Sequence, residues 1–174
     1  SNLCRGPMRI LGIDCGSRCT GYGIIDCGIR HHTLVDFGAI HLHSKNSFSS
    51  RLLTVHQELV KLIKSYQPQF AAVEDQFYLT NFKSVLKLGQ IKGVVLCTAA
   101  LANIPVVEYS PLEIKIAVTG YGRAGKKQVQ QMVKQLLGLT NVPEPHDAAD
   151  ALALALCHSQ VMTHHNSIEK YKDY

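Results

Sequence analysis

Acidic side chains stand directly after two short apolar segments of this sequence. Asp14 follows Ile10–Ile13, and Glu74 follows Phe70–Val73. Both segments have the length and residue types of buried strands. Side chains at the strand ends of an α/β sheet gather where ligands bind. A single acid in such a place is more often a turn or helix-capping residue, so the pair becomes informative only together with further acids.

Two more acids lie close together in the segment 146–152, which reads HDAADAL. Asp147 and Asp150 are three residues apart, so on a helix they share one face. The helix dipole alone explains an acid such as Asp147 in a first turn. It does not explain Asp150, which lies between two alanines in an apolar run, where a carboxylate is costly unless it is paired or binds a metal ion.

Four carboxylates of this kind point to divalent-metal chemistry. Carboxylate oxygens suit Mg²⁺ or Mn²⁺, and four of them, some shared, can hold two ions about 4 Å apart. Two such ions activate a water molecule and stabilise the leaving oxygen when a phosphodiester is hydrolysed. His146 lies beside the acids, but magnesium prefers oxygen to imidazole, so we expect Asp147 rather than His146 to be a ligand.

Basic and aromatic residues suggest a partner rich in phosphate. Cations cluster around the glycine-rich segment 120–125: Lys115, Arg123, Lys126 and Lys127. Cations and backbone N–H groups contact phosphates, although a solvated lysine surface explains the cluster equally well. Phe77 follows Glu74 by three residues, and we expect it to stack on an unpaired base. Core packing of Phe77 is the alternative, and Tyr78 is a weaker candidate for the stacking role.

The elements that must position these residues follow from hydrophobic periodicity. Three strands come first, and strands then alternate with helices, which predicts an α/β fold with a central mixed sheet flanked by helices. The helix at 81–102 is apolar on most sides, so we expect it to be buried on more than one face. The expected strands are 10–13, 21–25, 33–43, 70–73 and 105–109, and the expected helices are 50–66, 81–102, 111–118, 126–137 and 145–159.

Composition fits one domain of a globular enzyme. The chain has 174 residues, 46% hydrophobic and 18% charged, with a formal charge of +5. That charge is compatible with a polyanionic partner, but many small enzymes are equally basic. We find no uninterrupted apolar run of about 20 residues and no signal peptide in residues 1–7. We therefore expect a cytoplasmic protein that does not enter a membrane.

The six cysteines include no Cys-x-x-Cys pair. A zinc site built from them is therefore not expected, and we expect reduced thiols. Cys97 and Cys157 lie in apolar helical segments, where a free thiol behaves as a small hydrophobic side chain.

Five stretches together resemble the RuvC family of Holliday junction resolvases. Residues 11–18 and 20–23 read LGIDCGSR and TGYG, close to the family form G-I-D-P-G-S-R-x-T-G-Y-G. Four further stretches agree in order and spacing: VEDQF at 73–77, LKLGQ with KGV at 86–94, GYG leading into KKQVQ at 120–130, and DAADALA at 147–153. Cys15 replaces the usual proline, a change of turn stiffness that removes no ligand.

The resemblance implies an RNase H-like fold over residues 8–158. Residues 1–7 then form an N-terminal remnant, and residues 159–174, with His158 before them, read as a polar tail.

The resemblance also implies a homodimer that cuts four-way DNA junctions by paired symmetric nicks in recombination and repair. It implies the RuvAB branch-migration complex as a further partner. The motif acids would hold two Mg²⁺ ions per subunit, and Mn²⁺ can substitute for Mg²⁺. Asp14 would lie between both ions, Glu74 would bind one of them, and Asp147 with Asp150 would bind the other. Lys115 and Lys126 resemble the DNA-contacting lysines of the family.

Two other interpretations remain open from the residues. An Asp-x-Gly-Ser turn between strands also resembles the phosphate loop of sugar-kinase and actin-like ATPases, but those need a second loop and a much longer chain. A non-catalytic nucleic-acid module with this fold would be expected to lose acids, and this chain keeps all four.

Overall fold

A computed structural model of the chain describes residues 7–28, 31–75 and 81–169, with side chains up to residue 163. The strands are β1 (Met8–Asp14), β2 (Cys19–Cys27), β3 (His32–His41), β4 (Phe70–Glu74) and β5 (Val106–Tyr109). The helices are α1 (Phe48–Tyr66), α2 (Phe82–Leu101), α3 (Pro111–Thr119), α4 (Lys126–Leu136) and α5 (His146–Glu169).

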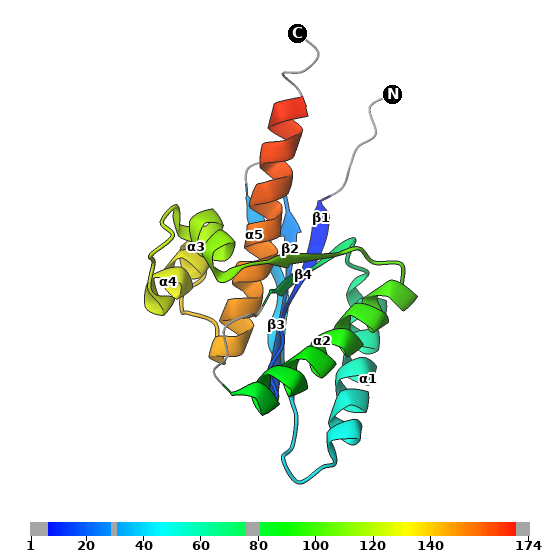
Figure 1. Cartoon of the computed structure of the whole chain (residues 1–174). Helices are drawn as coiled ribbons and strands as arrows, with labels where there is room; N and C mark the ends of the chain where they lie inside the picture. The colour runs from blue at the N-terminus through cyan, green and yellow to red at the C-terminus, as the bar shows by residue number, and fades with distance from the viewer. Residues whose placement is uncertain (1–6, 29–30, 76–80, 170–174) are drawn as a thin grey trace.

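The strands form one sheet in the order β3-β2-β1-β4-β5 (Figure 1). The pairs β1–β2 and β2–β3 are antiparallel, whereas β1–β4 and β4–β5 are parallel. The expected mixed sheet flanked by helices is confirmed.

Helices cover both faces of the sheet. Neighbouring strand residues point to opposite faces, so Ile10 packs in the core on the side of α3, α4 and α5, and Leu11 packs in the core on the side of α1 and α2. Figure 1 shows α5 lying along the sheet with α3 and α4 beside it, while α1 and α2 lie together elsewhere on the sheet. The site described below lies on the α5 side.

Helix α5 lies unusually close to β1 and β2 because both strands carry glycine beneath it. A Cβ atom at Gly12 would overlap the carbonyl oxygen of Ala151, and one at Gly21 would overlap that of Asp147. Ala148, Ala151 and the other small residues of the helix are buried in this contact. The alanines noted in the sequence are therefore one half of a close contact, and the strand glycines are the other half.

Among the residues that the structure describes, helix α2 buries only one face. Ile91, Val95, Thr98 and Ala99 are buried, whereas Phe82 and Leu86 on the opposite face are 75% and 52% exposed. Within the described residues α1 and the sheet cover one side of α2, so the expected burial of a further face stays a prediction for the dimer. Of the two cysteines in apolar helical segments, Cys97 is exposed and Cys157 is buried.

By length and composition alone, α2 is also apolar enough to cross a membrane, with 22% of the tested stretch buried. Lysines interrupt its apolar run, so no membrane span was expected from the sequence. The signal is weak, since the core helices of globular proteins meet the same test.

The last helix runs ten residues beyond its expected end at Ser159, to Glu169. His158 and Ser159 are buried rather than part of a polar tail. The Tyr109 hydroxyl and His158 Nδ1 are 2.7 Å apart in a hydrogen bond, and the Phe70 ring packs on the imidazole. His158 was placed in the tail because it is polar, but it is a core residue whose imidazole is hydrogen-bonded to Tyr109.

Candidate active site

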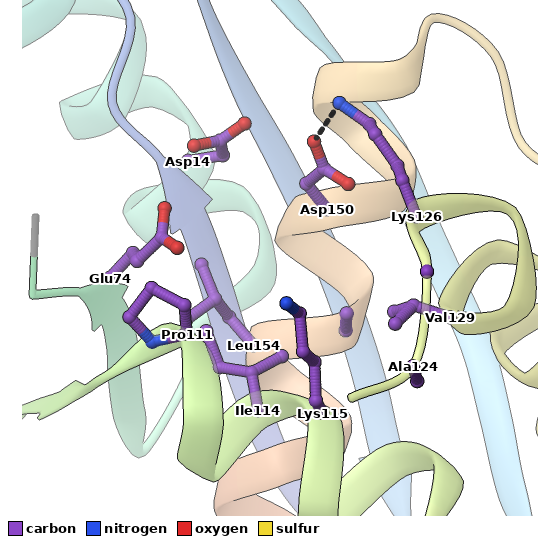
Figure 2. Close-up of a pocket in the computed structure, with 12 residues that line it drawn as sticks. Asp14, Glu74, Pro111, Ile114, Lys115, Ala124, Lys126, Val129, Asp150 and Leu154 are labelled. Atoms are coloured by element: carbon purple, nitrogen blue, oxygen red, sulfur yellow. Dashed lines mark ion pairs between the residues drawn. The ribbon is translucent and has the colours of Figure 1, made fainter. Parts of the chain in front are cut away.

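Asp14 and Glu74 are brought together by parallel pairing. They are the last residues of β1 and β4, which are neighbours with Ile13 opposite Val73. The carboxyl ends of parallel strands meet at one edge of a sheet, where ligands bind. Figure 2 shows the two carboxylates side by side at that edge.

Helix α5 brings the other two acids close enough to Asp14 for their charges to act on it. Asp150 lines a cleft together with Asp14 and Glu74. Asp147 is one turn earlier and does not line the described cleft. Its carboxylate accepts a hydrogen bond from the thiol of Cys19, at the start of β2.

The electrostatics of Asp14 reflect the charges of the other three acids. Burial raises the pKa of Asp14, and the charges of Asp150, Glu74 and Asp147 raise it further, to about 8, while Lys126 opposes them. All three other acids therefore lie close enough to Asp14 for their charges to be felt. Such crowding of like charges is typical of functional sites.

Two of the predicted cations lie in the cleft. Its volume is about 350 Å³, and its remaining walls are mostly apolar: Pro111, Ile114, Ala124, Val129, Ala153 and Leu154. Lys126 Nζ lies 3.1 Å from Asp150 Oδ2, and the bond to Asp150 raises the pKa of Lys126. Lys115 rises from α3 toward the same space (Figure 2).

The other predicted DNA-contacting residues lie elsewhere. Arg123 and Lys127 are exposed and do not line the described cleft. Phe77 and its alternative Tyr78 fall outside the described residues.

The four carboxylates are the right type of ligand for a hard divalent cation, although their side chains are not arranged as a complete coordination site. Carboxylate oxygens crowded around a half-buried acid are suitable ligands for Mg²⁺, and a cation would relieve the repulsion that raises the pKa of Asp14. Within the part of the chain that the structure describes, no three His, Cys, Asp or Glu side chains converge tightly enough to form a metal site. Asp150 instead faces the ammonium of Lys126.

Two contacts around the acids were not foreseen. One is the bond from Cys19 to Asp147, at the position that the family motif leaves variable. The other joins Gln130 Nε2 to His146 Nδ1 at 3.0 Å, which turns one side of the imidazole toward α4. Neither contact could be inferred, because both join residues distant in sequence.

Comparison with known proteins agrees with this geometry. The family model "Crossover junction endodeoxyribonuclease RuvC" matches residues 10–158. A protein of that name from Fusobacterium nucleatum is 46% identical over 87% of this chain and 80% of its own length. Another from Hydrogenovibrio crunogenus is 48% identical over 89% of both chains.

Solved structures support the same assignment. RuvC of Thermus thermophilus, in complex with a Holliday junction substrate, superposes with a TM-score of 0.86 at 32% identity, over 90% of this chain and 95% of that one. The yeast mitochondrial resolvase Ydc2 shares the fold at 17% identity, with a TM-score of 0.66, 95% of this chain and 85% of that one being covered. The RNase H-like fold is thereby confirmed, and the chain belongs to the RuvC family of crossover junction endodeoxyribonucleases.

Proposed function

We propose that this protein resolves four-way DNA junctions by magnesium-dependent hydrolysis of phosphodiester bonds in opposed strands. The observation that carries the proposal is the meeting of Asp14, Glu74 and Asp150 around one cleft that also contains two lysines. The family name and the junction bound to the Thermus relative support this choice of substrate. The expected setting is DNA recombination and repair in the cytoplasm.

The four acids are the proposed ligands of two Mg²⁺ ions. Such ions supply a nucleophile at neutral pH and stabilise the charge on the leaving oxygen. Asp14 is central because it senses the charge of each of the other three acids. Lys126 pairs with Asp150 in the described structure, and its ammonium would be available to contact a DNA phosphate if Asp150 held a metal ion instead.

The basic residues are the proposed DNA contacts. Lys115 and Lys126 lie in the cleft, beside the scissile phosphate in this proposal. Arg123 and Lys127 extend the positive surface outward, where they would contact neighbouring phosphates. Phe77 keeps its proposed role of stacking on a base at the crossover.

A homodimer completes the proposal. Paired nicks need two sites related by symmetry, and a two-fold axis supplies them with one kind of interface. The RuvAB branch-migration complex is the proposed supplier of junctions.

The deciding experiment is a nicking assay on a synthetic mobile junction with each strand labelled, with and without Mg²⁺. We expect Asp14→Asn, Glu74→Gln and Asp150→Asn to abolish cutting and to retain junction binding, because metal ligands act in the chemical step and phosphate contacts supply affinity. Glu58→Gln on the distant helix α1 is the matched control. Wild-type nicking by any of the three variants would remove that residue from the site.

A further inference from the structure

Lys92 on α2 forms ion pairs with carboxylates at the ends of two strands. Its Nζ lies 2.6 Å from Glu108 Oε2, on β5, and 3.5 Å from Asp75 Oδ1, directly after β4. The Lys92 side chain is only 19% exposed. A lysine enclosed to this degree differs from the exposed lysines of α1, of which Lys61 pairs with Glu58 at 69% exposure.

The two carboxylates belong to the segments that deliver the candidate site. Asp75 directly follows Glu74, and its backbone N–H donates to the Tyr109 carbonyl at 2.8 Å. Glu108 pairs with Val73 in the register of β4 and β5. Lys92 therefore joins the end of the strand that carries Glu74 to the strand that leads into α3 and Lys115.

The ammonium is positioned to act on this region without entering the cleft. Lys92 is not among the residues that line the cleft in the described part of the chain. Burial lowers its pKa, but the hydrogen bond and charge of Glu108, followed by those of Asp75, outweigh burial and raise it. Its charge also lowers the pKa of Cys15, next to Asp14, against the larger effect of burial. Lys92 thus remains a cation behind the acidic site.

We propose that Lys92 is a positioning residue that holds the Glu74 carboxylate in place for Mg²⁺ by tying Asp75 and Glu108 to helix α2. Without its charge, two carboxylates would face each other at the ends of adjacent strands, and their repulsion would displace the end of β4. This inference rests on the proposed function, in which Glu74 is a metal ligand.

The test compares Lys92→Met, Lys92→Gln and Lys92→Arg with Lys61→Met, which removes an exposed ion pair of the same type on α1. Two quantities are measured: the Mg²⁺ concentration that gives half-maximal junction cleavage, and Mn²⁺ binding to the DNA-free protein by electron paramagnetic resonance. Thermal unfolding and junction affinity are recorded for every variant. Lys92→Gln serves if Lys92→Met does not fold.

We expect Lys92→Met and Lys92→Gln to weaken metal binding about 10- to 100-fold, as is usual when a group that orients a metal ligand is lost. Lys92→Arg should restore most of the affinity, and Lys61→Met should leave it unchanged. A purely stabilising role would lower the unfolding temperature without moving the metal affinity.

The outcomes separate this inference from the function on which it rests. If the wild type binds Mn²⁺ and cuts junctions while the neutral Lys92 variants bind Mn²⁺ within twofold of it, the positioning role is wrong and the proposed function stands. If the wild type neither cuts junctions nor binds Mn²⁺, the proposed function fails, and the role of Lys92 fails with it.

Discussion

Asp14 lies where its negative charge destabilises the metal-free fold but suits its proposed role as a Mg²⁺ ligand. Burial and three neighbouring acids raise its pKa to about 8, so the metal-free protein holds a proton there over much of the range in which an unfolded chain has lost it. Between the unfolded pKa of about 4 and the folded value, the native state binds more protons. Stability from this group is therefore present at low pH and is lost as pH rises toward 8.

We expect Asp14→Asn to stabilise the metal-free protein at pH 8. The amide has no charge to be repelled, so the free energy of unfolding should rise by roughly 2 kcal/mol, less than the full shift in pKa implies because the site relaxes. The gain should shrink toward pH 4, where the wild-type carboxyl is also neutral.

Urea unfolding in EDTA at pH 5 and pH 8 measures this gain, with Glu58→Gln as the control for loss of an exposed acid. Adding Mg²⁺ should stabilise the wild type and not the variant. An Asp14→Asn protein less stable than the wild type at pH 8 would mean that Asp14 is not electrostatically strained.

His146 and Asp147 are neighbours with different surroundings. The charge of Asp147 raises the pKa of Asp14, and its carboxylate accepts a hydrogen bond from the Cys19 thiol. His146 is hydrogen-bonded to Gln130 on α4. Because Mg²⁺ prefers oxygen ligands, we expect Asp147→Asn to lower the rate of junction cleavage severely in Mg²⁺, and His146→Ala to lower it only mildly. Cleavage rates of both variants from pH 6 to pH 9 decide the order, and a larger loss for His146→Ala would reverse it.

Residue types in the sequence suggested the four acids and two of the cleft lysines, because a carboxylate in an apolar run or after a buried strand requires an explanation. They could not reveal Cys19 as the partner of Asp147 or Lys92 as the bridge between two strand ends. Cysteine is common as a small hydrophobic side chain, and lysine on a helix is usually solvated. Their roles arise only when distant segments fold together.

At the scale of elements, the site depends on how closely α5 lies on β1 and β2. Gly21 faces the backbone of Asp147 with no room for a side chain. We expect Gly21→Ala to push the first turn of α5 outward, at a cost of about 1–3 kcal/mol for overpacking. A displacement near 1 Å is enough to slow catalysis about 100-fold.

The control is Ser65→Ala, an exposed position on α1 that lies outside the contact between α5 and the sheet. Unfolding free energies and cleavage rates of the two variants should differ sharply, with Ser65→Ala no less stable than the wild type. Wild-type cleavage by Gly21→Ala would show that α5 can shift without disturbing the acids.

Periodicity predicted the elements well where one chain decides their burial, as in β1, β4 and α1. It failed where a partner outside the local pattern matters. The end of α5 was placed too early because His158 looks polar, although Tyr109 and Phe70 enclose it. For α2, periodicity could not tell which face this chain covers and which is left for a partner, because an apolar sequence does not say which protein packs against it.

At the scale of the whole molecule, α2 presents an apolar stripe that the described part of the chain leaves open. Its residues recur at helical spacing and are exposed: Phe82, Leu86, Gly89, Gly93 and Cys97. Among the described residues, nothing lies within 4 Å of a Cβ atom placed at Gly89 or Gly93. Large residues toward one end and glycines in the middle would let a second helix approach closely, so we expect the two-fold axis of the proposed dimer to pass near this stripe.

The protein should therefore be a dimer at micromolar concentration, and Leu86→Asp should convert it to a monomer. A charge buried at the interface would have no partner, which costs several kcal/mol, whereas micromolar dimers are held by about 8 kcal/mol. Leu53→Asp is the control, since Leu53 on α1 is 53% exposed and Leu86 is 52% exposed. Light scattering gives the mass of each variant, and unfolding curves show whether the monomer remains folded. A folded Leu86→Asp monomer should nick each junction at most once per encounter and so lose the paired cuts. If the wild type is itself monomeric, or if Leu53→Asp dissociates the protein and Leu86→Asp does not, the stripe on α2 is not the interface.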